Sequence, residues 1–300
     1  MTVSNVSTYG SLQGLLQNVA QVQNSLNNDQ IAVSSGHSAQ TFDGLNGSVE
    51  QLTSLNAQLA RLTNYTQNNG VVTSQLQSTN TALGQIQQIA TGIVSLIAQQ
   101  ISGTSNTTTS FDQQLQNNLA SITAQLNTTF EGNYLFSGTA TKTAPVTLPL
   151  PNPVTIGTPD AGYYKGSAQN STLRIADNQT IPNSIRADDS AFQQIIAGIQ
   201  QALQPNAGAD DLKNAENLVS QGLNGVIALQ STTNSNIVNL QQVTSQNQTL
   251  QTYYTGLSTN LTQSDVVALS TKIAQDQTIL EASFQAYARI SSLTLANYLK

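Results

Sequence analysis

The feature that most constrains the fold is a seven-residue repeat in the second half of the chain. It predicts one helix of about 50 residues, about 75 Å long, with a seam that packs against other helices. Asn236 and Asn247 fall in the seam, where they weaken it but can fix its register. The two sets of seam positions are Leu212, Val219, Val226, Thr233, Leu240, Asn247, Tyr254 and Leu261, and Ala215, Gly222, Leu229, Asn236, Val243, Leu250 and Leu257.

The N-terminal half contains three further amphipathic segments. Residues 8–34 carry a heptad pattern that Asp29 interrupts at a d position, and Gly36 is the expected helix stop. A second helix is expected over 48–69, where Gly70 either interrupts it or is a tolerated defect before the pattern resumes. Apolar residues at helical spacing from 111 to 130 then predict a third helix.

Helical spacing returns after the middle of the chain, first over 192–203 and then in the long heptad segment. The run Thr262-Gln263-Ser264-Asp265 ends the seam and supplies the N-cap of a last helix, whose apolar positions extend from Val266 to Leu293. Because each half lacks a partner for its own apolar stripes, we expect the helices of the two halves to pair with one another.

The central residues differ from both halves. From Gly132 to about Ala187 the chain holds most of its prolines and several short β-prone runs. The predicted fold is therefore mainly α, a long antiparallel helical rod with a small central β-rich insert. The expected divisions are a terminal coiled coil of 1–45 with 264–300, a helical rod of 46–131 with 190–263, and the insert at 132–189. The β-prone runs are Tyr134–Phe136, Val154–Ile156 and Leu173–Ile175.

Charge is scarce throughout the sequence. Charged residues make up 8% of the chain, against roughly 25% in an ordinary soluble protein. Uncharged polar surface is cheaper to desolvate than charged surface, so this composition suits packing against copies of the same chain. Nine scattered Lys and Arg residues in a chain of net charge −6 argue against nucleic-acid binding, and no basic amphipathic stripe points to a membrane surface. The N-terminus has no signal-peptide pattern, which by itself indicates the cytoplasm.

Residues that could carry chemistry are few, and each has a structural interpretation. Cysteine is absent and His37 is the only histidine, which leaves no catalytic triad and no metal site to build. The pairs Asp188-Asp189 and Asp210-Asp211 precede apolar helical runs and suit helix N-termini. The glycines between 132 and 138 fit turns rather than a phosphate-binding loop. We therefore predict no catalytic, cofactor-binding or metal-binding residues, no cofactor and no enzymatic activity.

Three segments resemble the family of bacterial flagellin and its hook-filament junction relatives, the hook-associated protein 3 group. Ile31–His37 is similar to a family turn that ends in glycine and lysine, and Phe130–Thr139 to a glycine-rich turn with a tyrosine-leucine-phenylalanine core. The C-terminal residues 279–293, with the ending Asn297-Tyr298-Leu299, resemble the junction relatives more than flagellin itself. The segment 37–44 departs from the family, because it lacks proline and has a single acid.

The resemblance implies a structural subunit of the flagellum that joins hook to filament, with a filament-forming flagellin as the alternative. It also implies export from the cell without a cleaved signal peptide, which replaces the cytoplasmic interpretation. The implied partners are further copies in a tube, other hook-associated proteins, flagellin and an export chaperone. A third hypothesis makes the insert a binding module for carbohydrate or a host surface, with which Tyr163 and Tyr164 are compatible, but a spacer domain exposed on the outside of the tube is the favoured interpretation of the insert. The residues expected at the assembly interface are Leu12, Leu15, Val19, Val22, Leu26, Leu280, Phe284, Tyr287, Ile290 and Leu293.

Overall fold

The computed structural model describes residues 3–37, 49–103, 108–150 and 162–298. The chain forms two compact units. Residues 1–60 and 251–300 make up unit 1, and residues 61–250 make up unit 2. Two long helices, α2 (Val49–Ile101) and α5 (Ala209–Thr262), contribute residues to both units. The mainly helical fold expected from the sequence is confirmed.

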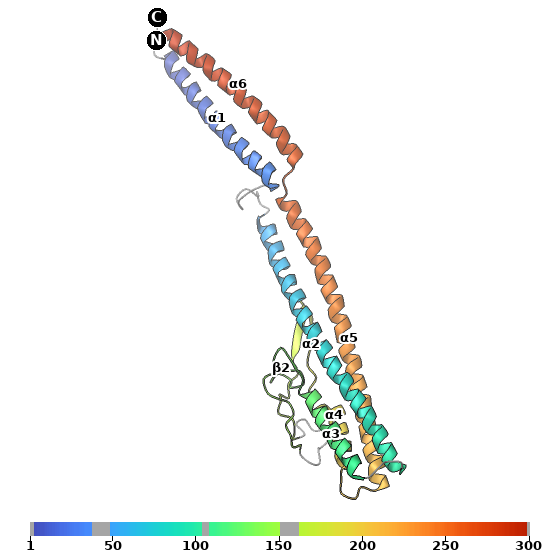
Figure 1. The fold of residues 1–300 in the computed structure, drawn as a ribbon. Coiled ribbons are helices and arrows are strands. Elements are labelled where there is room, and N and C mark those ends of the chain that lie inside the picture. Colours follow the sequence, from blue (N-terminus) through green and yellow to red (C-terminus); the bar gives the residue numbers. More distant parts are fainter. Residues whose placement is uncertain (1–2, 38–48, 104–107, 151–161, 299–300) are drawn as a thin grey trace. The chain divides into compact units, whose positions relative to one another are not determined.

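Unit 1 is built on two helices of equal length, α1 (Val3–Ser35) and α6 (Val266–Tyr298). They lie side by side and antiparallel (Figure 1), as expected for two stripes that lack a partner within their own half. Gly36 ends α1 with φ +73°, and its N–H donates to the carbonyl of Ala32 at 3.0 Å. Asp265 caps α6 by accepting from the N–H groups of Val267 and Ala268 at 3.1 and 3.0 Å. Both predicted helix boundaries are confirmed.

Unit 2 packs α2 and α5 with two shorter helices, α3 (Thr108–Leu126) and α4 (Ser190–Ala202). Its main core joins aliphatic side chains from all four helices to the insert. α2 runs without a break through Gly70, so this glycine is a tolerated defect and not an interruption. The fully buried side chains include Leu83, Ile86, Ile93, Ile97, Leu115, Ile122, Leu126, Phe136, Phe192 and Ile195.

The seam of α5 follows the heptad prediction over most of unit 2. The first set of positions is buried from Leu212 to Asn247, while in the second set Ile237 replaces Asn236 as the buried residue. Gly222 is a point of close approach rather than a weak point in the seam. A Cβ atom there would lie 2.5 Å from the carbonyl oxygen of Ala191 in α4, so only glycine fits.

The insert contains less regular β structure than the sequence suggested. β1 (Thr129–Phe130) pairs antiparallel with β2 (Asn133–Tyr134), and β3 (Thr172–Ala176) with β4 (Gln179–Pro182). The run Leu173–Ile175 is a strand as predicted. The run 134–136 leaves its strand after Tyr134 because Leu135 and Phe136 turn into the core, and 154–156 lies outside the described residues.

The β3–β4 hairpin packs on α2 and α5 through a second, smaller core of aliphatic side chains. Asn69 Nδ2 on α2 donates to the carbonyl of Ile175 at 3.2 Å, and Tyr65 OH donates to Asp177 at 3.1 Å. This core consists of Val72, Leu76, Ile175, Ile181, Ile237, Leu240 and Val243.

One helix, α2, is long and apolar enough by length and composition to cross a membrane. Its apolar side chains explain this without a membrane, because Leu83, Ile86, Ile93 and Ile97 are fully buried in the core of unit 2. A core helix of this kind meets the same criterion as a membrane span.

Candidate assembly surface

An apolar groove lies between α1 and α6 in unit 1. It has a volume of about 120 Å³ and presents no polar surface. Leu16 is 48% exposed and Phe284 is 52% exposed. The groove is lined by Leu15, Leu16, Val19, Phe284 and Tyr287. Contiguous exposed apolar side chains mark a surface that another macromolecule covers.

The ten residues predicted for the assembly interface differ in exposure. Two are buried, Val19 and Leu280, and five are half-buried: Leu12, Leu15, Val22, Leu26 and Ile290. Phe284 and Tyr287 are exposed and line the groove together with Leu15 and Val19. Nothing is described of the side chain of Leu293. Sequence reasoning missed Leu16, because a heptad pattern identifies the seam between two helices and not the face that they present outward.

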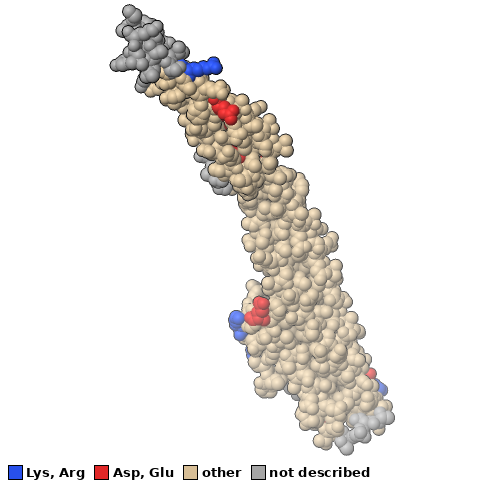
Figure 2. All heavy atoms as spheres, turned by 45° about the horizontal axis from the view of Figure 1, so that its top comes forward, with Lys and Arg blue, Asp and Glu red and all other residues tan. Residues whose placement is uncertain are grey.

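Unit 2 presents long uncharged helix faces. Within unit 2, residues 62–101 of α2 and 217–250 of α5 contain no Asp, Glu, Lys or Arg. On the face of the molecule that Figure 2 shows, the charged side chains form a few small groups with wide uncharged surface between them. On α5, Val238 is 61% exposed in a shallow groove that it shares with Asn234, Ser235, Asn239 and Gln242. Such a face can be desolvated against a neighbour at low cost.

The buried charges of the insert serve the fold. Arg186 Nε donates to Asp188 Oδ1 at 2.7 Å and Nη2 donates to Oδ2 at 3.2 Å, while Nη1 donates to the carbonyl of Ala168. The hydrogen bond to Asp188 raises the pKa of Arg186. Asp189 is the N-cap of α4, as predicted, and accepts from the N–H of Ala191 at 3.0 Å. A guanidinium and a carboxylate that satisfy each other in this way are poorly placed for chemistry on a substrate.

A cavity of about 260 Å³ adjoins this pair in unit 2. It lies between the insert and α5, with Arg186, Asp188 and Asp189 on one side and Thr232, Thr233 and Asn236 on the other. Thr233 Oγ1 donates to the carbonyl of Leu229 at 2.8 Å, and Asn236 Nδ2 donates to that of Pro182 at 3.4 Å. Both side chains are thus held by hydrogen bonds within the protein.

Tyr163 and Tyr164 lie in the core and are not available to stack on a sugar. Their exposed fractions are 1% and 4%. Tyr163 OH donates to the carbonyl of Ala187 at 2.7 Å, and burial raises its pKa. Burial and the nearby Asp188 carboxylate raise the pKa of Tyr164 to about 12. The carbohydrate-binding hypothesis for the insert therefore loses the residues on which it depended.

The glycine-rich turn after β2 requires a glycine at position 138. Gly138 has φ +62°, and a Cβ atom there would lie 2.5 Å from the carbonyl oxygen of Ser167. The neighbouring N–H of Thr139 donates to the carbonyl of Gln169 at 3.1 Å, which fixes the turn against the following segment. Leu135 and Phe136, which precede it, are buried in the core. The turn is therefore a packing element that anchors the insert.

His37 has a structural place as expected. It lies just beyond the end of α1, its N–H donates to Ser35 Oγ at 3.3 Å, and it forms an isolated antiparallel bridge with Gln263. Within the described ranges, no group of three or more His, Cys, Asp or Glu side chains is placed to hold a metal ion.

Comparison with known proteins gives both a family match and a fold. Residues 6–141 match the family of the bacterial flagellin N-terminal helical region. None of the curated proteins that were compared matches the sequence.

Two solved structures share the fold. A protein of Vibrio parahaemolyticus described as a flagellar hook-associated protein has a TM-score of 0.57 and 16% identity, over 71% of this chain and 96% of that one. FlgL of Bacillus cereus has a TM-score of 0.50 and 16% identity, over 64% of this chain and 97% of that one. The resemblance seen in the sequence is confirmed to this extent: residues 6–141 match the bacterial flagellin N-terminal helical region, and the fold is similar to that of a protein described as a flagellar hook-associated protein.

Proposed function

We propose that the chain is a non-enzymatic structural subunit of the bacterial flagellum that joins the hook to the filament. The observation that carries the proposal is the apolar groove on α1 and α6, where Leu16 and Phe284 are about half exposed. Residues 6–35 of α1 lie within the segment that matches the flagellin N-terminal helical region. A structural subunit needs a surface that is covered only after assembly, and this groove supplies it.

The proposed partners are further copies of the chain in a tube, other hook-associated proteins and, on the filament side of the junction, flagellin. An export chaperone is the proposed partner before assembly. In this proposal the protein leaves the cell without a cleaved signal peptide and resides outside it. The uncharged faces of 62–101 and 217–250 support repeated contacts between copies, because few charges must be desolvated. The same property suits both a short collar and a long filament.

A filament-forming flagellin is the second candidate, because its helical ends would look much the same. The junction function is favoured by the C-terminal ending Asn297-Tyr298-Leu299 and by the fold shared with hook-associated proteins. The two functions differ in the extent of growth, since head-to-tail contacts without a closing partner polymerise indefinitely.

Seeded polymerisation separates the two candidates. Purified protein is added to isolated hook fragments and followed by electron microscopy. A collar of constant short length that then accepts flagellin is the result expected for a junction protein. Long filaments would make the chain a flagellin instead, and failure to bind hook fragments at any concentration would contradict both candidates.

A substitution in the groove tests the surface itself. Phe284→Asp places a carboxylate in apolar surroundings and is expected to abolish collar formation while secretion into the medium continues. Val267→Asp is the matched control, because Val267 is also on α6, is 79% exposed and does not line the groove. Normal collars from the Phe284→Asp variant would show that the groove is not the assembly surface.

A further inference from the structure

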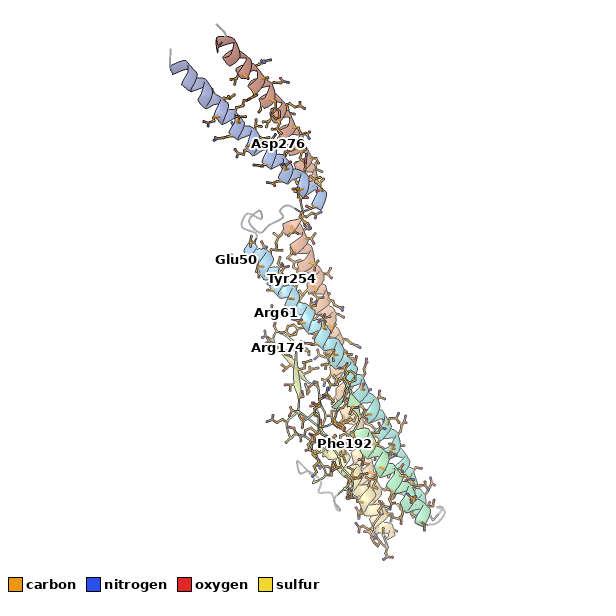
Figure 3. All side chains as sticks on the ribbon, turned by 60° about the vertical axis from the view of Figure 1, so that its left-hand side comes forward. Glu50, Arg61, Arg174, Phe192, Tyr254 and Asp276 are labelled. Carbon is orange, nitrogen blue, oxygen red and sulfur yellow. The ribbon has the colours of Figure 1, made fainter. Side chains whose placement is uncertain are left out.

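A second cavity of unit 2 lies where the β1–β2 hairpin meets α2. Its volume is about 220 Å³, below the roughly 300–1,000 Å³ of sites for drug-sized ligands. It is lined by Val71 and Gln75 of α2, by residues around the hairpin turn, and by Asn183. Figure 3 shows the side chains of the insert against α2 between the labelled Arg174 and Phe192. This cavity belongs to unit 2, so the proposed function, which rests on the groove of unit 1, does not use it.

One polar group of the lining is buried without a partner. Asn183 Oδ1 accepts no hydrogen bond from the residues that the structure describes. The backbone of Asn183 is engaged, because its N–H donates to the carbonyl of Ser171 at 3.0 Å and its carbonyl accepts from Gln75 Nε2 at 3.5 Å. A buried amide oxygen without a donor is unfavourable. A ligand hydroxyl that donates to it would therefore be stabilised.

The remaining polar groups of the lining suit an uncharged ligand with several hydroxyls. Glu131 is the only charged residue among them. Lys142 Nζ donates to the carbonyl of Gly132 at 3.1 Å, so the hairpin turn carries one charge of each sign and does not favour a cation. Hydroxyl groups both donate and accept, as do the hydroxyls of a polyol, while the carboxylate accepts. The lining hydroxyls belong to Thr141, Ser171 and Ser184.

The backbone of the hairpin turn gives no reason for a glutamate at position 131. Glu131 has φ +49° and Gly132 has φ +74°, and together they connect β1 to β2. Two-residue turns with both φ angles positive favour Asn, Asp or Gly at the first position. Glu131 is thus held in a strained conformation, and such residues often have a functional side chain. Its carboxylate lines the cavity from this turn.

The cavity also offers apolar surface and is held in shape by hydrogen bonds. Val71 is 50% exposed and Phe130 is half-buried, and both line it. The N–H of Tyr134 donates to the carbonyl of Thr141 at 2.8 Å, which fixes the hairpin against the following turn. A site that is formed before its ligand arrives loses less free energy to ordering. Apolar surface beside a few polar groups is the usual composition of a small-molecule site.

We propose that this cavity binds one sugar ring of a neutral saccharide. Asn183 Oδ1 and the Glu131 carboxylate accept hydrogen bonds from ring hydroxyls, and Val71 contacts the C–H groups of the ring. The small volume limits the bound part to about one ring. This site differs from the one expected at Tyr163 and Tyr164, which are buried in the core. The inference concerns the single chain and does not depend on the proposed flagellar function.

Saturation-transfer NMR on the full chain tests the proposal with free glucose, galactose, mannose, N-acetylglucosamine and N-acetylgalactosamine. We expect transfer to at least one of these sugars, with a Kd on the order of 1 mM, because a single ring makes few contacts. The absence of transfer to every sugar at concentrations well above this Kd would overturn the proposal.

Glu131→Asn is the decisive variant, because Asn suits the left-handed turn better than Glu but lacks the carboxylate. The Kd should rise by about tenfold, the effect of one hydrogen bond to a charged group, while the Tm stays the same or rises. Asn183→Ala removes the buried acceptor, keeps the backbone bonds and should raise the Kd by a similar factor. Glu216→Asn makes the same substitution on α5, outside the lining, and should leave the Kd unchanged.

Binding that neither Glu131→Asn nor Asn183→Ala weakens would mean that the sugar binds elsewhere, which would also overturn the proposal. Loss of Tm in Glu131→Asn would contradict the account of the turn. Seeded polymerisation tests the flagellar function separately, so a failure of one proposal can be told apart from a failure of the other.

Discussion

Both units pair long helices that carry little charge, but the two pairs differ in how far they bury their apolar side chains. The main core of unit 2 fully buries aromatic and aliphatic side chains such as Phe136, Phe192 and Ile195. In unit 1 the seam of α1 and α6 is only half-buried at most positions, and Phe284 and Tyr287 remain exposed. Unit 2 therefore buries its apolar side chains within the single chain. Unit 1 leaves apolar side chains exposed, and in the proposed function neighbouring subunits cover them.

The largest expected effect is the loss of a core aromatic in unit 2. Phe192 is fully buried and its ring meets Phe136 edge-on, with ring centroids 6.0 Å apart. Phe192→Ala should lower the free energy of unfolding by about 3–5 kcal/mol, because it leaves a large cavity. Urea titration followed by circular dichroism measures this, with exposed Tyr253→Ala as the control. A loss below about 1 kcal/mol would contradict the division into a deep and a shallow core.

The buried ion pairs provide the second comparison. Asp188→Asn should cost unit 2 about 3 kcal/mol, because Arg186 then loses its partner beside a fully buried site. Asp29→Asn should cost about 1 kcal/mol at most, since half of the side chain of its partner, Lys272, is exposed to water. Urea unfolding of both variants checks the order. Equal losses, or a larger loss for Asp29→Asn, would mean that the unit 1 seam is as deeply buried as unit 2.

Alkaline pH should weaken unit 2 through Tyr164. Its folded pKa of about 12 lies above the ordinary value of 10.0. The unfolded state therefore ionises first, so stability that is complete below pH 10 declines as the pH rises toward 12. The decline from this residue should be about 1–2 kcal/mol. Urea midpoints between pH 8 and 12 measure it. Tyr164→Phe should make the decline shallower while Tyr253→Phe should not, and the part that persists belongs to Tyr163, whose pKa is also raised by burial. An identical decline in all three proteins would remove Tyr164 as the cause.

The smallest expected effect is an increase in stability. Gly70 lies in the interior of α2 and a Cβ atom there would meet open space. Gly70→Ala should therefore stabilise unit 2 by about 0.5–1 kcal/mol, through the lower entropy of the unfolded chain. Gly222→Ala is the matched variant with the opposite sign, because its Cβ atom would collide with α4. Thermal unfolding measures both variants: the Tm should rise for Gly70→Ala and fall for Gly222→Ala. Shifts of the same sign would contradict the difference between the two glycines.

Periodicity predicted the helices of this chain well, because each helix buries a stripe that recurs along the sequence. The end of α1 at Gly36 and the N-cap of α6 at Asp265 were also predictable, because capping residues are local signals in the sequence. Periodicity did not show that Asp29 is paired with Lys272, which is 243 residues away in the chain. The three-part division of the chain at 1–45 with 264–300, 46–131 with 190–263, and 132–189 stays a prediction.

The insert was harder to predict than the helices. Its short β-prone runs indicated strands, but Leu135 and Phe136 leave the strand and are buried in the core that they share with the helices. The outward groove was predictable only in part. Phe284 and Tyr287 were identified as candidates through their place in the C-terminal pattern, whereas Leu16 needed the three-dimensional arrangement of α1 and α6.

The most direct test of the account is the reactivity of a single thiol in the groove. Leu16→Cys places one cysteine in a chain that has none, at a position 48% exposed in the single chain. Maleimide labelling is timed for soluble protein and for collars assembled on hook fragments, with Asp210→Cys in unit 2 as the reference thiol, because this side chain is 98% exposed and lies outside the uncharged faces proposed for contacts between copies. The account predicts fast labelling at position 16 in the soluble chain and at least about tenfold slower labelling after assembly. Equal rates in the two states would contradict burial of the groove between copies.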